Sequence, residues 1–117
     1  MKPASAKAKG RVAENVWVEY LQRCGWQYAE RRRLAGIHDR GDIAGTPGIT
    51  WEIKNQKSHD FPAWLRELAE EQLNTGDPVG VLVVKPRGVT NPSDWWCVMT
   101  GHQLIQLLTD AGWGPTE

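Results

Sequence analysis

Two carboxylates and a lysine stand at a spacing that suits a divalent metal ion. Asp42 lies in a short candidate strand, residues 41–44, and Glu52 and Lys54 lie two apart in an alternating stretch, residues 49–54. Side chains two apart on a strand leave from the same face, and the compact connection makes the two strands neighbours. Crowded carboxylates repel one another unless a cation lies between them. Mg²⁺, with Mn²⁺ as a substitute, is the expected cofactor because it prefers hard oxygen ligands and keeps water and phosphate beside one or two carboxylates.

The lysine of this pattern has a place in the same chemistry. Lys54 would orient an attacking water or offset the negative charge of a phosphoryl transition state. The alternative for these three residues is a solvent-facing strand with a cross-strand ion pair, because the pattern is short.

Three further polar residues extend the candidate site. Glu14 falls on the flank of an expected helix, where it would be either a third carboxylate at the rim of the cleft or an ordinary exposed residue. Gln56 continues the polar face beyond Lys54 and either touches the site or faces solvent. Gln72 follows Leu68 by one turn on the apolar side of a second helix, where it is either an accessory residue of the site or a satisfied buried amide.

The elements that would position these residues follow from periodicity and breakers. Helical spacing predicts a helix over residues 11–24, and alternation predicts a strand over 26–32. After the strands at 41–44 and 49–54, a helix begins near Asp60 and Pro62 and ends at Gly76. Strands over 79–84 and 95–99 and a closing helix over 101–111 complete the order α-β-β-β-α-β-β-α. A helix crossing between strands 49–54 and 79–84 implies that they pair in parallel.

The whole pattern resembles a known family. Lys9-Gly10-x-x-x-Glu14 opening a helix, then Asp42 in a short strand and Glu52-x-Lys54 in the next, is similar to the PD-(D/E)xK nucleases. Within them, residues 9–85 look most like the archaeal and phage Holliday junction resolvases. One position departs from the motif, since the proline that precedes the family's aspartate is Gly41 here.

The resemblance implies a fold, an activity and roles for named residues. The fold would be α/β and restriction-endonuclease-like, a mixed β-sheet flanked by helices. The activity would be metal-dependent hydrolysis of DNA phosphodiesters, with branched or four-way DNA as substrate and a two-fold homodimer as the acting form. Asp42 and Glu52 would be metal ligands, Lys54 the catalytic lysine, and Glu14 the helix-borne acid that completes the site. Lys9 and Arg11 would contact phosphate.

Charge divides the chain into two halves and points to the same partner. Residues 1–59 hold 11 Lys and Arg against 6 Asp and Glu, whereas residues 60–117 hold 3 against 8. A basic half suggests a polyanion such as DNA, the alternative being a lopsided solvated surface. The candidate DNA contacts are Lys7, Lys9, Arg11, Arg31, Arg32 and Arg33.

Length and composition set the remaining bounds. The 117 residues suit a flexible basic arm over 1–9 and a single domain over 10–117. No apolar run approaches the roughly 20 residues of a membrane span, and two distant cysteines suggest small buried residues in a reducing cytoplasm, bacterial or phage-infected. Two rivals remain, another structure-specific, single-strand or restriction-type nuclease of this fold and a non-catalytic DNA-binding module.

Overall fold

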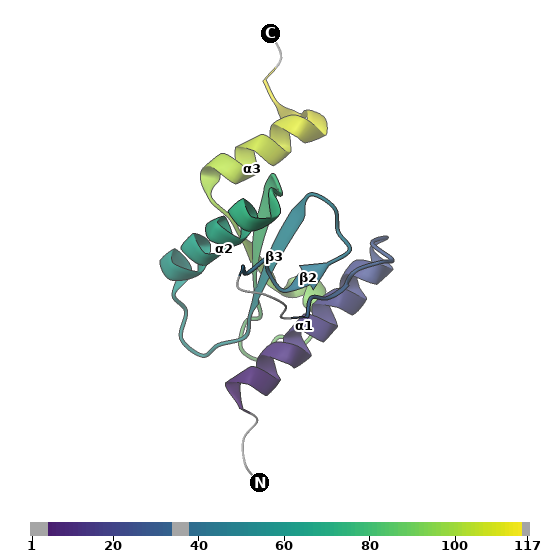
Figure 1. Cartoon of the computed structure of the whole chain (residues 1–117), viewed down its shortest axis with the longest axis vertical. Coiled ribbons are helices and arrows are strands. Elements are labelled where there is room, and N and C mark those ends of the chain that lie inside the picture. The colour runs from purple at the N-terminus through teal and green to yellow at the C-terminus, as the bar shows by residue number, and fades with distance from the viewer. Residues whose placement is uncertain (1–4, 34–37, 116–117) are drawn as a thin grey trace.

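The computed structural model describes residues 5–33 and 38–115, and within them the chain is a mixed α/β structure with three α-helices and two small sheets (Figure 1). In chain order the elements are α1 (Ala6–Arg23), β1 (Glu30–Arg31), β2 (Ile43–Ala44), β3 (Ile49–Lys54), α2 (Phe61–Thr75), β4 (Val79–Val84), the 3-10 turn η1 (Pro92–Asp94), β5 (Trp96–Val98), α3 (Gly101–Leu108) and the π-helical turn η2 (Thr109–Trp113). No helix within these ranges combines the length and the apolar character that a membrane span needs.

The larger sheet has the strand order β3-β4-β5. β3 and β4 are parallel, in a register that sets Ile49 beside Val79 and Lys54 beside Val84, and β5 is antiparallel to β4. The parallel pair joined through α2 confirms the expectation from the sequence. Its cause is connectivity, because a helix between two strands carries the chain back to the end where the first strand began.

The two faces of this sheet pack against different helices, as Figure 1 shows. Alternate residues of the strands, Trp51 and Ile53 among them, meet Trp17 and Leu21 of α1. The other face meets α2 through two buried side chains of that helix, Trp64 and Leu68, which pack on Leu82 and Val84 of β4. The polar face of β3 therefore lies under α2 and is enclosed by it.

Several elements are shorter or longer than the sequence suggested. The first helix begins at Ala6, because the Ser5 hydroxyl accepts the N–H of Ala8 and caps it, so Lys7 and Lys9 are helical and do not belong to an arm. The strand expected over 26–32 is only Glu30–Arg31, since its partner β2 offers two residues for pairing. The closing helix ends at Leu108 and continues as the π-helical turn.

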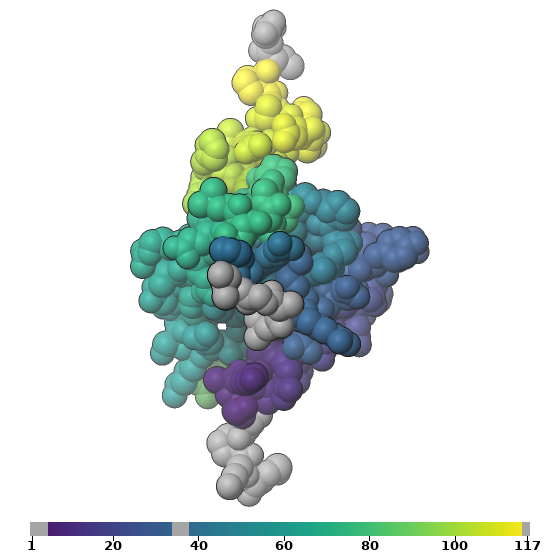
Figure 2. All heavy atoms as spheres, in the orientation of Figure 1, coloured from purple at the N-terminus to yellow at the C-terminus, as the bar shows by residue number. Residues whose placement is uncertain are grey.

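The C-terminal part of the chain projects from the rest. α3 lies at the end of the molecule opposite the start of α1, and Figure 2 shows it and the following turn projecting beyond the body. In the adjacent tryptophan pair, Trp95 is 6% exposed and Trp96 is 50% exposed, so only Trp96 faces outward. Cys24 and Cys97 are both exposed, which corrects the expectation of burial.

Candidate metal centre

The polar face of β3 carries the predicted pair. Thr50, Glu52 and Lys54 alternate with Trp51 and Ile53, and the aromatic and aliphatic pair faces α1. Glu52 is 4% exposed, and Lys54 is half-buried. Because α2 covers this face, the acid and the lysine are enclosed between a strand and a helix. The alternative of a solvent-facing strand with a surface ion pair does not hold.

Asp42 is fixed against Glu52 by the backbone of β3. The Asp42 N–H donates to the carbonyl of Trp51 at 2.8 Å, and the Asp42 Oδ2 accepts the N–H of Ile53 at 2.7 Å. Asp42 and Glu52 are consequently close enough for each carboxyl group to influence the pKa of the other. Burial raises the pKa of Asp42, and the Ile53 N–H opposes this by favouring the ionised form.

Gly41 stands where the resembled family has proline, and the backbone explains it. Its φ is +88°, a value that the proline ring, locked near −65°, does not adopt. A Cβ at this position would lie 2.8 Å from the Trp51 carbonyl oxygen and 3.4 Å from Glu71 Oε2. Glycine thus lets the chain turn tightly into Asp42 beside β3.

Lys54 reaches into the same space. Its Nζ lies 3.4 Å from Glu52 Oε1 and 3.2 Å from Glu67 Oε2. Burial disfavours the charged lysine, but the carboxylates of Glu52 and Glu67 outweigh that effect and raise the pKa of Lys54. Lys54 therefore remains an ammonium group at the centre of the acids.

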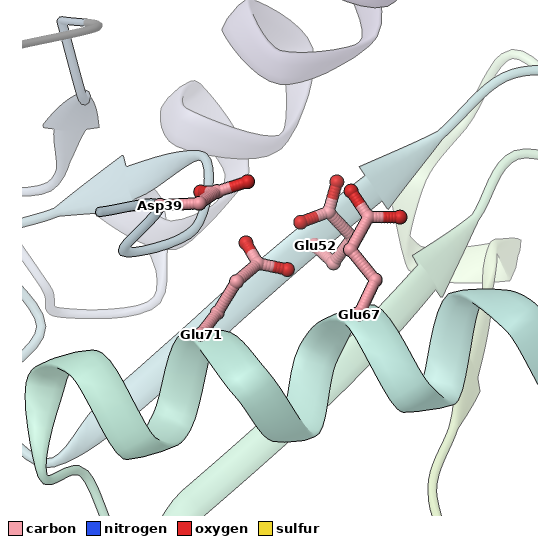
Figure 3. A group of neighbouring side chains, drawn as sticks. All are labelled: Asp39, Glu52, Glu67 and Glu71. Atoms are coloured by element: carbon pink, nitrogen blue, oxygen red, sulfur yellow. The ribbon is translucent and has the colours of Figure 1, made fainter. Parts of the chain in front are cut away.

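The structure adds three acids that the sequence analysis did not place here. Figure 3 shows Glu67 and Glu71 extending from successive turns of α2 toward Glu52, with Asp39 facing them from the segment before β2. Ligand atoms of Asp39, Glu52, Glu67 and Glu71 all lie within 4.8 Å of one another, so the group could hold a metal ion. One signal was available for Glu71, because it falls three residues after the core residue Leu68 on the buried stripe of the helix.

Glu71 fits a cation ligand best of these acids. It is 1% exposed, and both its carboxyl oxygens, like Oε2 of Glu52, lack a hydrogen-bond partner among the described residues. Burial raises the pKa of Glu71, and the adjacent Glu52 raises it further. Burial likewise raises the pKa of Glu52, to about 8, although contact with Glu71 opposes this. Buried carboxyl oxygens without a donor are costly unless a proton or a metal ion lies between them.

Glu14 stands at the edge of this group, outside the four-acid cluster. Its Oε2 lies 3.7 Å from Nε of Arg31 and, in the part of the chain described, has no hydrogen-bond partner. Burial raises the pKa of Glu14, the charge of Asp42 adds to this, and Arg31 opposes both. The flank of α1 therefore brings Glu14 within electrostatic range of Asp42.

The two predicted glutamines have different surroundings. Gln56 follows β3 and is exposed. Gln72 donates to the carbonyl of Asp77 at 3.3 Å and lies 3.5 Å from Oε1 of Gln103, whose oxygen also accepts the N–H of Gly80. These contacts join α2, β4 and α3, and they match the alternative of a satisfied amide.

The six predicted basic residues differ in their surroundings and in the side of the molecule that they face. Arg31 faces Glu14 as described, Arg33 is exposed, and Arg32 is half-buried. At about 100° per helical residue, Lys7 and Arg11 lie within about 60° of the direction of Glu14, whereas Lys9 lies about 140° from it. The helical start of α1 thus sends Lys9 to a different side from the other two, which the expectation of a flexible arm did not anticipate.

Comparison of the chain with protein-family models, with curated proteins and with solved structures finds no match. The geometry of the centre therefore carries the functional argument.

Proposed function

We propose that the protein is a metal-dependent DNA endonuclease of the PD-(D/E)xK type. The observation that carries the proposal is the convergence of Asp42, Glu52 and Lys54 in one enclosed centre. An acid immediately before the short strand β2, an acid on the next strand and a lysine two residues later lie close together. A purely structural core has no use for this arrangement, since burying such groups costs free energy.

A divalent ion fits the acids at this centre. Glu52 of β3 and Glu71 of α2, which belong to the four-acid cluster, would hold it together with Asp42 and Glu14, the ligands that the resemblance implies, all through the oxygen atoms that Mg²⁺ and Mn²⁺ prefer. When bound, such an ion supplies Lewis-acid stabilisation of a phosphoryl oxygen and a more acidic water.

The chain's own groups complete the proposed reaction. The Lys54 ammonium, already held by two carboxylates, orients the attacking water or stabilises charge on the phosphoryl oxygens. The Ile53 N–H fixes Asp42, so that the ligand geometry does not depend on the substrate. The basic surface of Lys7, Arg11 and Arg33 would attract the phosphate backbone without reading its sequence.

The resemblance to Holliday junction resolvases suggests the substrate and the assembly. We favour branched DNA, such as a four-way junction, cleaved by a homodimer. Two active sites related by a two-fold axis would then act on symmetrically related strands.

A panel of DNA substrates tests this function. Linear duplex, single-stranded, flapped and four-way DNA are incubated with the full chain and Mg²⁺, Mn²⁺ or EDTA. We expect incision with either metal ion, most of it on branched DNA, and none with EDTA or with Glu52→Gln. Binding without incision under any divalent ion would instead identify a DNA-binding module, and incision of all DNA alike would remove the junction preference.

A further inference from the structure

A cavity of about 350 Å³ opens beside the acid centre. It lies between the β2–β3 connection and the C-terminal end of α2. The side chains that matter here are two arginines, Arg32 and Arg40, with Asn74 and Asp77 from the end of α2 and Ile49 from β3. This volume suits a small ligand group rather than a single water.

The cavity adjoins the centre along α2 and β3, the two elements that carry most of its acids. On α2, Glu67 and Glu71 belong to the centre, and Thr75, one turn or about 6 Å further along, lines the cavity. On β3, Thr50 precedes Glu52 by two residues, or about 6.6 Å, on the same face. The Thr50 hydroxyl donates to Asp77 at 2.8 Å and lies 3.0 Å from the Thr75 hydroxyl, so it ties the cavity wall to the strand.

The charge of the cavity is opposite to that of the centre. Neither Arg32 nor Arg40 forms an ion pair within residues 5–33 and 38–115, and Nε of Arg32 is buried there without a hydrogen-bond partner. The Arg32 Nη2 makes only a long contact, 3.4 Å, to the carbonyl of Ile43. Asp77, the acid of the lining, is engaged by the Thr50 hydroxyl. Two arginines that line the cavity and form no ion pair within the described residues favour an anionic ligand.

The cavity is also held to the centre by direct hydrogen bonds. The Asn74 amide donates to the carbonyl of Asp39 at 2.7 Å, and the Arg32 N–H donates to the carbonyl of Asp42 at 2.8 Å. Arg40 lies between these two acids in the chain. An anion bound by the arginines would thus sit in fixed relation to a phosphate at the acids.

We infer that this cavity binds a second phosphate of the DNA strand that is cleaved at the acid centre. Along α2, Glu71 of the centre and Thr75 of the cavity wall are about 6 Å apart, which is comparable with one or two nucleotide steps of about 3.4 Å each. Pro47 and Ile49 offer an apolar wall for the adjoining sugar. The inference rests on the proposed function, because it is the acid centre that makes the ligand a nucleic acid.

Nuclear magnetic resonance of the full chain tests the cavity without any cleavage. The Nε–H signal of Arg32 is followed in EDTA during titration with a 5′-phosphorylated thymidine dinucleotide, with its unphosphorylated form and with inorganic phosphate. We expect a saturable shift with the first ligand, a shift at least tenfold weaker in affinity with inorganic phosphate, and loss of the response in Arg40→Ala. Equal affinity for inorganic phosphate, or an unmoved Arg32 signal, would overturn the inference.

A second experiment locates the phosphate on longer DNA. Each phosphate near the cleaved bond, or across the bound segment if no cleavage is seen, is replaced in turn by an uncharged methylphosphonate, and affinity is measured in EDTA. Removing one charge-assisted contact should weaken wild-type binding about tenfold at one position. Arg40→Ala should be insensitive there, and the control Arg87→Ala, an exposed arginine of another loop, should behave like wild type.

These measurements separate the failure of the cavity from the failure of the nuclease proposal. If no position distinguishes Arg40→Ala from wild type while the wild-type protein still incises DNA, the cavity inference is wrong and the function stands. If the position is found but no divalent ion supports incision, the cavity is a phosphate site of a DNA-binding protein, which overturns the inference as stated.

Discussion

At the scale of single residues, the acids of the centre differ in the donor groups that hold their carboxyl oxygens. Asp42 has a backbone donor from Ile53, Glu52 has Lys54, and Glu71 has no donor within the described ranges. This difference matters because an acid that already accepts a strong hydrogen bond is pre-oriented, whereas an acid without a donor gains most from a cation.

The first prediction concerns the proposed roles of Asp42 as a metal ligand and of Lys54 as the catalytic lysine. Asp42→Asn and Lys54→Ala should each lower the incision rate by roughly 100-fold or more, because a metal ion or a fixed ammonium contributes several kcal/mol to the transition state. DNA affinity in EDTA should change little, since the basic surface supplies it. Single-turnover cleavage and fluorescence anisotropy measure the two quantities. The exposed neighbours Glu70→Gln and Lys57→Ala are the matched controls, and near wild-type incision by either test variant removes that residue's assigned role.

The second prediction follows from the raised pKa values of the buried acids. Burial raises the pKa of Glu52 to about 8 and also raises that of Glu71, so the folded state holds protons that the unfolded chain releases near pH 4.5. Their contribution to stability is therefore complete below about pH 4.5 and is lost as the pH rises toward 8 and beyond. The melting temperature of the metal-free protein should fall from pH 6 to pH 8.5.

A metal ion and one variant separate this effect from general charge repulsion. Mg²⁺ should restore the melting temperature at pH 8.5 more than at pH 6, because the ion binds the ionised acids. Glu71→Gln should flatten the pH dependence, whereas Glu70→Gln should leave it unchanged. A wild-type melting temperature that rises over this range would contradict the assignment of protons to the buried pair.

At the scale of elements, the alternation of β3 and the crossover through α2 could be predicted, and the acids of α2 could not. Glu52 and Lys54 share a face because of the period of a strand, and the parallel pair follows from connectivity. Which turn of α2 lies over Glu52 depends on the rotation and shift of the helix on the sheet, which side-chain packing decides. Asp39 and the arginine-lined cavity also emerge only with the tertiary structure, because they depend on how the segment before β2 packs against α2. The positive φ that requires glycine at position 41 is likewise visible only in the structure.

The first helix gives the third prediction. Lys7 and Arg11 share the side of α1 that carries Glu14, so replacing either with alanine should lower the slope of log affinity against log salt concentration by about 0.9. Lys9→Ala should change it less, because Lys9 leaves the helix about 140° from Glu14. Salt titrations on two unrelated duplex sequences give the slopes. If Lys9→Ala has the largest effect, DNA approaches another side of α1.

At the scale of the whole molecule, the part of the chain after β4 exposes apolar surface on several elements. Ile105 is 62% exposed on α3, Trp113 is 80% exposed beyond it, and Trp96 lies on β5, at the edge of the sheet. The acidic excess of residues 60–117 makes this half a poor surface for DNA, which leaves it available for protein contact.

The fourth prediction is that this surface forms the proposed homodimer. Trp96→Glu and Ile105→Glu should each give a folded monomer, while Val12→Glu, equally exposed on α1, should remain dimeric. Sedimentation at micromolar concentration reports the mass. A monomer variant should nick one strand of a junction and lose paired incision. A wild-type protein that sediments near its monomer mass of 13.2 kDa with full junction cleavage rules out the dimer.

The measurement that tests the central claim most directly is the rate of single-turnover incision as a function of Mg²⁺ concentration, for wild type and Glu52→Gln in parallel. Glu52 lies within 4.8 Å of Glu71 and influences the pKa of Asp42, so the proposed centre cannot operate without its charge. We predict a saturable rise in the wild-type rate and no incision by Glu52→Gln at any Mg²⁺ concentration, with DNA binding intact. Incision by wild type in EDTA, or incision by Glu52→Gln at the wild-type rate, would contradict a metal-dependent nuclease centred on Glu52.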